Sequence, residues 1–357
     1  MRAAVARRQQ LVVEDLPEPV PGDGHALVAV KACGICGSDL HTLRHAHHML
    51  DVVEATGMGG GFDPERDFVL GHEYAAEVLE LGPGTDGITV APGDLVVSIP
   101  FLIAGADLVP LGFSNDYPGA YAERMLLTAG ACIPVPNALD HRRAALTEPM
   151  AVGLHSVNKS GIEPGDAALV VGCGPIGLAI IVWLAARGVE PIVASDLSAR
   201  RRALAAELGA HAVVDPREEP IFDAWRRVDG MRPVVVYEAV GVPGLLDDVI
   251  FDAPPQARVL VAGVCMEPDT IRPLIGVVKE INLQFAFGYD PVEFAETLRA
   301  IAEGTIDVAA LVTGTVGIEG IADAFAALAD AEDHVKILVE PDAPADLTPL
   351  GDTPPGR

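Results

Sequence analysis

The pattern of hydrophobic positions changes character near residue 150. Before it, apolar residues fall in short β-like runs that frequent Gly and Pro residues separate, as in strands joined by turns. Beyond it, continuous β-branched runs alternate with helical patterns, which is typical of a parallel sheet covered by helices on both faces. We therefore predict an α/β protein with a mostly antiparallel β domain over residues 1–150 and a doubly wound parallel sheet over residues 151–287.

The same pattern predicts the individual elements. In the first region we expect strands at 26–30, 74–81 and 94–99. In the second we expect strands at 167–171, 191–195, 212–214, 233–237 and 258–262, with helices at 178–187 and 199–208. Residues 288–340 hold helical segments at 291–303 and 318–331 and a strand at 336–339, and we expect them to return to the first domain. Residues 341–357 are rich in Pro and Asp without apolar periodicity, which predicts a disordered tail.

Composition narrows the possible partners. A chain of 357 residues, half of them hydrophobic, suits two ordered globular domains. Its 51 acidic and 24 basic residues give a net charge of -27, which repels polyanions, so we expect neither nucleic acid nor an anionic membrane as partner. Five cysteines without disulfide spacing indicate reduced thiols and a cytoplasmic location. The uncharged stretch 167–186 is long enough for a membrane span, but Gly and Pro divide it, so we interpret it as soluble core.

A G-x-G-x-x-G motif lies directly between an expected strand and an expected helix, at Gly172, Gly174, Pro175, Ile176 and Gly177. The first glycine permits a tight turn, the second lets the backbone approach a pyrophosphate, and the third allows close packing of helix on strand. The helix N-terminus attracts the phosphate charge. The motif alone is weak evidence, but in this context it favours a dinucleotide-binding site and not an ordinary βα turn.

Asp196 ends the next expected strand, where a carboxylate would accept hydrogen bonds from the adenosine ribose hydroxyls of NAD. It would repel the 2′-phosphate of NADP. Arg200, Arg201 and Arg202 follow closely and could partly offset that repulsion, and we count Arg201 among the cofactor-binding candidates. We predict NAD as the cofactor and NADP as the less favoured alternative.

A second set of residues has the chemistry of metal ligands: Cys36, His72, Glu73 and Glu148. Three protein ligands and an open position describe a catalytic zinc, whereas a structural zinc is closed by four ligands. Alone, the pair of Cys33 and Cys36 could be a redox pair, and His72 with Glu73 could be a solvated polar pair at a strand start. Their presence beside a dinucleotide motif favours a metal site.

With these residues the chain resembles the zinc-dependent medium-chain alcohol and polyol dehydrogenases over nearly its full ordered length. The motifs are Gly34-Ile35-Cys36-Gly37-Ser38-Asp39-Leu40-His41, Gly71-His72-Glu73, Gly93-Asp94, Gly119-Ala120-Tyr121-Ala122-Glu123, Glu148-Pro149 and the glycine fingerprint. The resemblance implies a GroES-like β domain interrupted by a Rossmann domain, with the active site in the cleft between them.

The resemblance also implies roles for the metal ligands. Cys36 and His72 would bind zinc. Glu148 stands where the family has its third ligand or a carboxylate that acts through the metal's water, and Glu73 stands where a carboxylate coordinates zinc or exchanges with water. The sequence does not rank these two carboxylates. Asp39 would orient a ligand imidazole and raise its basicity.

Further roles follow from the same resemblance. Ser38 and His41 would form a proton relay, because zinc lowers the pKa of a bound alcohol and the released proton needs a path out of a dry cleft. Hydride would then pass to the nicotinamide. Val264 and Phe287 stand where backbone groups hold the nicotinamide carboxamide. Lys336 stands where the family has a base near the pyrophosphate, although an exposed Lys beside a strand is an equal alternative.

The chain departs from the family pattern in two places. Residues 91–123 contain no cysteine, whereas many relatives bind a structural zinc there, so we predict one catalytic zinc per chain and no structural zinc. The interval between His41 and His72 is longer than is usual for the family, and we expect residues 42–68 to form a wall or lid of the substrate cleft. A second metal site on His45, His47 and His48 is a less favoured alternative to a solvated polar helix.

We therefore expect an NAD-linked oxidoreductase that interconverts a secondary, cyclic or polyol alcohol and the corresponding ketone or aldehyde. Its partners would be a small alcohol or ketone substrate and, as in relatives assembled through the Rossmann sheet edge, further copies in a homodimer or homotetramer. Two alternatives remain. One is reduction of an activated C=C bond, which zinc-free cousins on the fold perform, and the other is a non-catalytic dinucleotide-binding protein.

Overall fold

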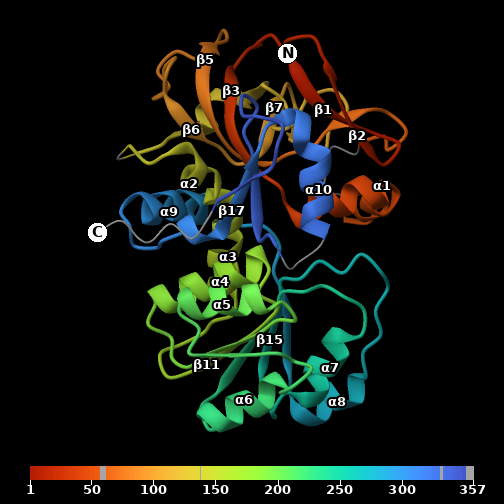
Figure 1. Cartoon of the computed structure of the whole chain (residues 1–357), viewed down its shortest axis with the longest axis vertical. Coiled ribbons are helices and arrows are strands. Elements are labelled where there is room, and N and C mark those ends of the chain that lie inside the picture. The colour runs from red at the N-terminus through yellow and green to blue at the C-terminus, as the bar shows by residue number, and fades with distance from the viewer. Residues whose placement is uncertain (57–61, 137, 330–332, 351–357) are drawn as a thin grey trace. The chain divides into compact units, whose positions relative to one another are not determined.

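The computed structural model describes residues 1–56, 62–136, 138–329 and 333–350, and it divides into two compact units (Figure 1). The first unit contains Met1–Glu148, Leu298–Gly304 and the chain from Val308 onward, and the second contains Pro149–Thr297 and Thr305–Asp307. The return to the first unit comes later than residue 288, because the start of helix α9 (Pro291–Ala302) is held inside the second unit. There the carboxylate of Glu293 binds His155 at 2.8 Å and Asn158 at 2.6 Å.

The first unit is built mainly from antiparallel strands, as its short apolar runs predicted. One sheet has the order β2-β1-β4, a larger sheet has the order β10-β6-β5-β3-β18-β17-β19 with β9 also on β3, and β7 and β8 form a hairpin. The strands are β1 (Arg2–Arg7), β2 (Gln10–Asp15), β3 (His25–Gly34), β4 (Phe68–Val69), β5 (Glu73–Leu81), β6 (Leu95–Val97), β7 (Phe101–Ala104), β8 (Asp107–Pro110), β9 (Arg124–Thr128), β10 (Ile133–Pro134), β17 (Val312–Val316), β18 (Lys336–Val339) and β19 (Thr348–Pro349).

Strand β3 organises this unit, because its backbone pairs with β5, β9 and β18. Its residues are mostly buried, which suits a strand covered on both faces. At its end, Gly34 lies opposite Glu73 of β5 and Leu338 of β18. This register brings three segments that are distant in sequence to the point where β3 ends.

Helix α1 (Gly37–Thr56) follows immediately, with a kink at His45 where the backbone leaves helical geometry. Leu40, Leu43, Ala46 and Met49 pack against the apolar core, while the histidines of the helix are exposed. The segment is thus a helix with exposed histidines, as the polar pattern predicted. The Gly59–Gly61 part of the expected lid lies outside the described residues. The other helical segments of this unit are η1 (Ala129–Ala131), α2 (His141–Ala145), η2 (Ala309–Leu311), η3 (Ile318–Gly320) and α10 (Ile321–Ala329).

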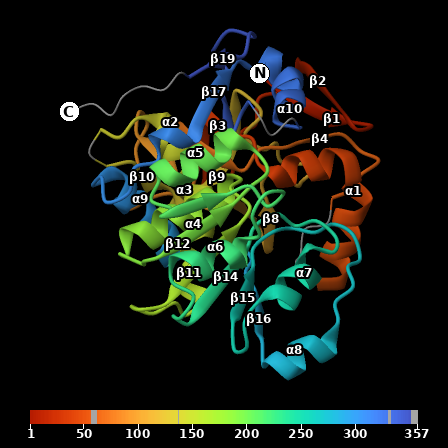
Figure 2. The ribbon, with the colours of Figure 1, turned by 60° about the horizontal axis from the view of Figure 1, so that its bottom comes forward.

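The second unit has a parallel sheet in the order β13-β12-β11-β14-β15-β16, and its strands β14, β15 and β16 run side by side in Figure 2. The chain moves outward from β11 to β13 and then returns to β14, so the sheet is doubly wound as predicted, with its switch point beside β11. The elements are α3 (Thr147–Lys159), β11 (Ala167–Val171), α4 (Pro175–Ala186), β12 (Ile192–Ser195), α5 (Ala199–Glu207), β13 (Ala212–Val214), α6 (Ile221–Val228), β14 (Val234–Glu238), α7 (Leu245–Asp252), β15 (Arg258–Val261), α8 (Pro273–Lys279) and β16 (Asn282–Phe285).

The uncharged stretch 167–186 forms β11, a turn and α4, and nearly all of it is buried. Its indole at Trp183 donates a hydrogen bond to the carbonyl of Met150 at 2.8 Å. Across the described ranges, the structure contains no helix with the length and apolar character that crossing a membrane requires.

The expectation of a disordered tail was wrong for residues 341–350. Strand β19 pairs with β17, and the amides of Gly317 and Leu350 donate to the carbonyls of Pro344 and Thr313. A Cβ atom at Gly320 would lie 1.8 Å from the carbonyl oxygen of Ala345, so the segment packs closely on backbone. Backbone pairing, which needs no apolar periodicity, holds this segment. Residues 351–357 lie outside the described part of the chain.

Candidate active site

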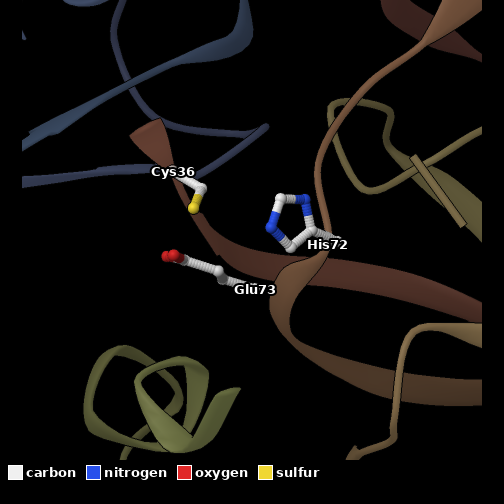
Figure 3. A group of neighbouring side chains, drawn as sticks. All are labelled: Cys36, His72 and Glu73. Atoms are coloured by element: carbon white, nitrogen blue, oxygen red, sulfur yellow. The ribbon is translucent and has the colours of Figure 1, made fainter. Parts of the chain in front are cut away.

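The predicted metal ligands Cys36, His72 and Glu73 converge in the first unit. Their sulfur, nitrogen and oxygen atoms all lie within 4.8 Å of one another, and the three side chains face a common space in Figure 3. His72 and Glu73 are buried and Cys36 is half-buried. Within the ranges that the structure describes, this is the one group of three or more metal-ligating side chains that gathers so closely.

The local backbone explains how these side chains meet. Cys36 stands in the turn from β3 to α1, and Glu73 begins β5 directly opposite the end of β3. Gly71, just before His72, has a φ of 100°, and a Cβ atom there would lie 2.8 Å from the backbone nitrogen of Tyr121. Only glycine fits this close approach, so the chain turns here directly before His72 and the start of β5.

Asp39 connects two of the three ligands. Its Oδ2 atom accepts a hydrogen bond from the backbone amide of Cys36 at 3.0 Å, and its Oδ1 atom lies 3.3 Å from Nδ1 of His72. The hydroxyl of Tyr121 donates to Oδ2 at 2.5 Å. Asp39 and Tyr121 are fully buried. The predicted orienting role of Asp39 thus has a matching geometry, and Tyr121 is a support that sequence reasoning did not identify.

Burial and charge oppose each other in this cluster. Burial lowers the pKa of His72, but the Asp39 carboxylate outweighs it and raises that pKa well above its ordinary value. Conversely, burial raises the pKa of Asp39, but His72 and the hydrogen bonds around it bring the net value below the ordinary one. These opposite shifts favour the charged forms of both groups, so a metal that binds His72 would compete with a proton.

Cys33 does not belong to the cluster. It is fully buried, and desolvation raises the pKa of its thiol well above the ordinary value. Its sulfur lies 3.5 Å from the carbonyl oxygen of Gly34. Cys33 and Cys36 are both free cysteines in the structure. Of the two cysteines in the Cys-x-x-Cys spacing, only Cys36 therefore joins His72 and Glu73 in the cluster.

Glu73 is held by Lys336, the first residue of β18. The ammonium donates to both carboxylate oxygens at 2.7 Å and to the carbonyl of Ile35 at 3.0 Å. The side chains of Lys336 and Glu73 are 2% and 0% exposed. Burial lowers the pKa of Lys336, but Glu73 outweighs it and the net shift is upward. The structure thus places Lys336, which the resemblance assigned to the pyrophosphate, beside the metal-ligand cluster.

Gly34 is a further residue that the sequence reasoning gave no role. A Cβ atom on Gly34 would lie 2.0 Å from Oε2 of Glu73, so a larger residue would displace the carboxylate. Glu148 lies at the start of α3 and is not a member of the close cluster. Its charge makes a small upward contribution to the pKa of Lys336, after those of burial, Glu73 and Cys36.

The two relay candidates lie on the first turns of α1. The hydroxyl of Ser38 is 3.4 Å from Nε2 of His72, so it borders the cluster directly. His41 lies one turn further on, and its pKa is lowered by burial and by the neighbouring His45 and Arg44. A lowered pKa keeps this imidazole neutral near pH 7, when it can accept a proton.

The glycine motif occupies the carboxyl end of β11, at the switch point of the parallel sheet. Gly172 has a φ of 95°, and a Cβ atom on Gly177 would lie 1.9 Å from the carbonyl oxygen of Gly172. In contrast, the space around Gly174 is open, since the nearest atom to a Cβ there is a guanidinium nitrogen of Arg201 at 4.0 Å. Pro175 and Ile176 begin α4, whose N-cap is Gly174.

Asp196 lies beside this turn, at the end of β12. Its carboxylate accepts hydrogen bonds from the amides of Cys173 at 2.7 Å and Ser198 at 2.8 Å. Val264 and Phe287, assigned by resemblance to the nicotinamide end, are 52% and 74% exposed on the same unit. The turn, the carboxylate and these loops all belong to the second unit.

Each of the two units matches a known protein family. Residues 22–137 match the family described as alcohol dehydrogenase GroES-like domain, and residues 175–303 match the family described as zinc-binding dehydrogenase. The first match contains the Cys36 cluster, and the second begins within the glycine motif.

Full-length relatives agree with these matches. (R,R)-butanediol dehydrogenase of Bacillus subtilis (strain 168) is 32% identical over 96% of this chain and 100% of its own length. A crystal structure of 2R,3R-butanediol dehydrogenase from Bacillus subtilis, 30% identical, has a TM-score of 0.81 over 96% of this chain and 99% of that one. Sorbitol dehydrogenase of Bacillus subtilis (strain 168) is 27% identical over 96% of this chain and 97% of its own.

A solved structure with a bound dinucleotide is also similar. It is described as a zinc-binding dehydrogenase from Sinorhizobium meliloti 1021 bound to NADP, and it is 26% identical, with a TM-score of 0.79 over 95% of this chain and 99% of that chain. Together these similarities indicate zinc, a nicotinamide cofactor and alcohol or polyol oxidation and reduction. They do not favour reduction of C=C bonds.

Proposed function

The chain belongs to the zinc-dependent medium-chain alcohol and polyol dehydrogenases, and from this premise we propose that it interconverts a secondary alcohol of a diol or polyol and its ketone, with NAD as hydride carrier. The observation that carries the proposal is the convergence of Cys36, His72 and Glu73 in a chain that also has a dinucleotide-binding turn. The relatives are named for butanediol and sorbitol, and both compounds have more than one hydroxyl group.

The donor set of the cluster fits zinc. A thiolate, an imidazole and a carboxylate are ligands of catalytic zinc sites. We propose that Cys36 and His72 bind one zinc ion per chain, with Glu73 or Glu148 as the carboxylate. When bound, zinc supplies a Lewis acid that favours the ionised form of an alcohol. Asp39 contributes by holding the Cys36 backbone and the His72 ring in place.

The same helix supplies a route for the proton. The Ser38 hydroxyl can both accept and donate, and it lies beside His72 at the edge of the cluster. His41, one turn along α1, reaches solvent, although partial desolvation lowers its pKa. We propose that the proton released from the alcohol passes from Ser38 to His41 and then to water.

NAD is the dinucleotide that suits the turn. Each oxygen of Asp196 accepts one backbone amide and keeps a lone pair for a ribose hydroxyl. A 2′-phosphate would meet this negative charge, although Arg201 is near the turn. We propose that the backbone at Gly174 approaches the pyrophosphate, and that the backbone at Val264 and Phe287 holds the nicotinamide carboxamide.

The second unit offers a surface for self-association. Strand β16 is the edge of its sheet, and an edge strand presents unpaired backbone groups. Apolar side chains next to it are strongly exposed, namely Leu274, Val277, Val278 and Phe285. We propose that two chains pair along β16 in a homodimer, which can be a half of a homotetramer. The five free cysteines support a cytoplasmic location.

A metal and turnover assay tests the proposed function. Protein loaded with zinc and freed of excess metal should contain about one zinc per chain and should reduce NAD with (R,R)-butane-2,3-diol or sorbitol. Cyclohexanol and NADP serve as comparison substrate and cofactor, and the Ser38→Ala variant tests the relay through a loss of turnover without loss of zinc. Zinc retained by the protein without turnover of any alcohol would instead support a non-catalytic dinucleotide-binding protein.

A further inference from the structure

The contact between Lys336 and Glu73 uses every donor of one group and both acceptors of the other. An ammonium has three hydrogens, and Lys336 directs them to the two oxygens of Glu73 and the carbonyl of Ile35. Both side chains are buried, so water does not replace any of these bonds. The ammonium of Lys336 is therefore fully hydrogen-bonded, and each oxygen of Glu73 is already engaged by it before any metal binds.

The position of this pair gives it an influence on the metal site. Glu73 is one of the three converging ligand candidates, and Ile35 is the residue before Cys36. The carboxylate must therefore divide its negative charge between an ammonium and a metal ion. Two cations beside one buried carboxylate repel each other, and weak screening in the interior makes this repulsion larger than at a surface.

We propose that Lys336 is a positioning residue that competes with the metal for Glu73 and keeps this carboxylate a weak, exchangeable ligand. This inference rests on the proposed zinc function. Cys36 and His72 would then be the firm ligands of the ion, while Lys336 would restrain Glu73 and so leave a position available to substrate.

Two other roles for Lys336 give different expectations. If the pair only stabilises the fold, removal of the ammonium should loosen the site and weaken metal binding. If Lys336 binds the pyrophosphate, its removal should weaken dinucleotide binding and leave the metal unchanged. Of the three roles, only competition for Glu73 predicts that the metal binds more tightly when the ammonium of Lys336 is removed.

The test uses Lys336→Met, which keeps much of the side-chain volume without the charge, and Lys336→Gln as a second neutral variant. Lys336→Arg keeps the charge as the matched control. Zinc affinity is measured on the metal-free full chain by competition with a chelator, and the visible spectrum of the cobalt-substituted protein reports the ligands. We expect both neutral variants to bind zinc about tenfold or more tightly, with a changed cobalt spectrum, and Lys336→Arg to resemble the wild type.

The double variant Lys336→Met/Glu73→Gln identifies the carboxylate as the ligand. Because it lacks the carboxylate, its cobalt spectrum should not show the change seen in Lys336→Met. Unchanged or weaker zinc affinity in both neutral variants would overturn the proposal, and so would a change confined to the NAD dissociation constant. Failure of the wild-type chain to bind zinc at all would instead refute the proposed function, so the two failures are distinguishable.

Discussion

The metal-ligand cluster and the dinucleotide-binding turn reach their function by opposite means. The cluster is made of side chains, and two of them lie against another buried group, as His72 does against Asp39 and Glu73 against Lys336. The turn depends on missing side chains, since Gly172 and Gly177 leave no room for a Cβ atom and Gly174 leaves space open. The first site is therefore sensitive to loss of a polar atom, and the second to gain of a carbon atom.

The largest expected effect is on the metal side. Cys36→Ser should lower kcat/KM for the alcohol by more than about a hundredfold, because loss of a ligand should exceed the 10–100-fold cost of losing a supporting contact. Zinc content should fall while the NAD dissociation constant stays nearly unchanged. Cys265→Ser, also a half-buried cysteine, is the matched control. A large loss of NAD affinity in Cys36→Ser would contradict the separation of the two sites.

At the dinucleotide-binding turn, the addition of one carbon atom should be enough to weaken NAD binding. Gly174→Ala should raise the NAD dissociation constant by about tenfold, equivalent to about 1.4 kcal/mol, because its methyl group fills the space left for the pyrophosphate. Its melting temperature and zinc content should not change, since no protein atom lies closer than 4.0 Å. Gly177→Ala should instead lower the melting temperature. Equal destabilisation by the two substitutions would show that the open space at Gly174 has no role.

A smaller effect is expected from the support of the metal ligands. Tyr121→Phe removes only the hydroxyl that donates to Asp39. We expect zinc affinity to fall by about tenfold, as is typical for groups that orient a ligand, with NAD affinity unchanged. Chelator competition measures this. Tyr237→Phe is the control, because it also removes a buried hydroxyl, but from the second unit. It should leave zinc affinity unaltered.

The smallest effect is expected from an ion pair away from both sites. Burial alone would raise the pKa of Glu340, but His141 and Arg142 lower it to about 2. A folded-state pKa below the ordinary 4.5 means that this stabilisation is fully present above about pH 4.5 and is lost as the pH falls through 2. Glu340→Gln should cost less than about 1 kcal/mol at pH 7. Urea unfolding at pH 7, 4 and 3 should show this difference shrinking; a constant difference would contradict the pairing.

Much of the fold was predictable because its strands are fully buried or alternate cleanly. Strands 167–171, 212–214 and 336–339 were predicted with the bounds that the structure shows. Strand β19 and the β7–β8 hairpin were missed, since their burial is partial and their pairing depends on distant backbone. The helix expected at 318–331 begins as the short η3 turn before α10, and its last two residues lie outside the described ranges.

The convergence of Cys36, His72 and Glu73 with Asp39 beside them was predictable, but two of the supporting residues were not. Cys, His and Glu are residue types that bind metals, so their occurrence together beside a glycine motif can be recognised in a single sequence. Gly34 and Tyr121 are ordinary residues whose roles come from a close approach and a single hydroxyl. Lys336 was noticed, but its contact with Glu73 arises from the pairing of β3 with β5 and β18, which the sequence does not display.

The bond between Lys336 and the carbonyl of Ile35 spans 301 positions of the chain. A ribosome makes the protein from its N-terminus, so Cys36, His72 and Glu73 emerge long before their basic neighbour does. Until β18 has been synthesised, the carboxylate of Glu73 lacks the counter-ion that it has in the complete chain. The metal pocket in its mature form is thus completed only near the end of translation, and a truncated product would lack it.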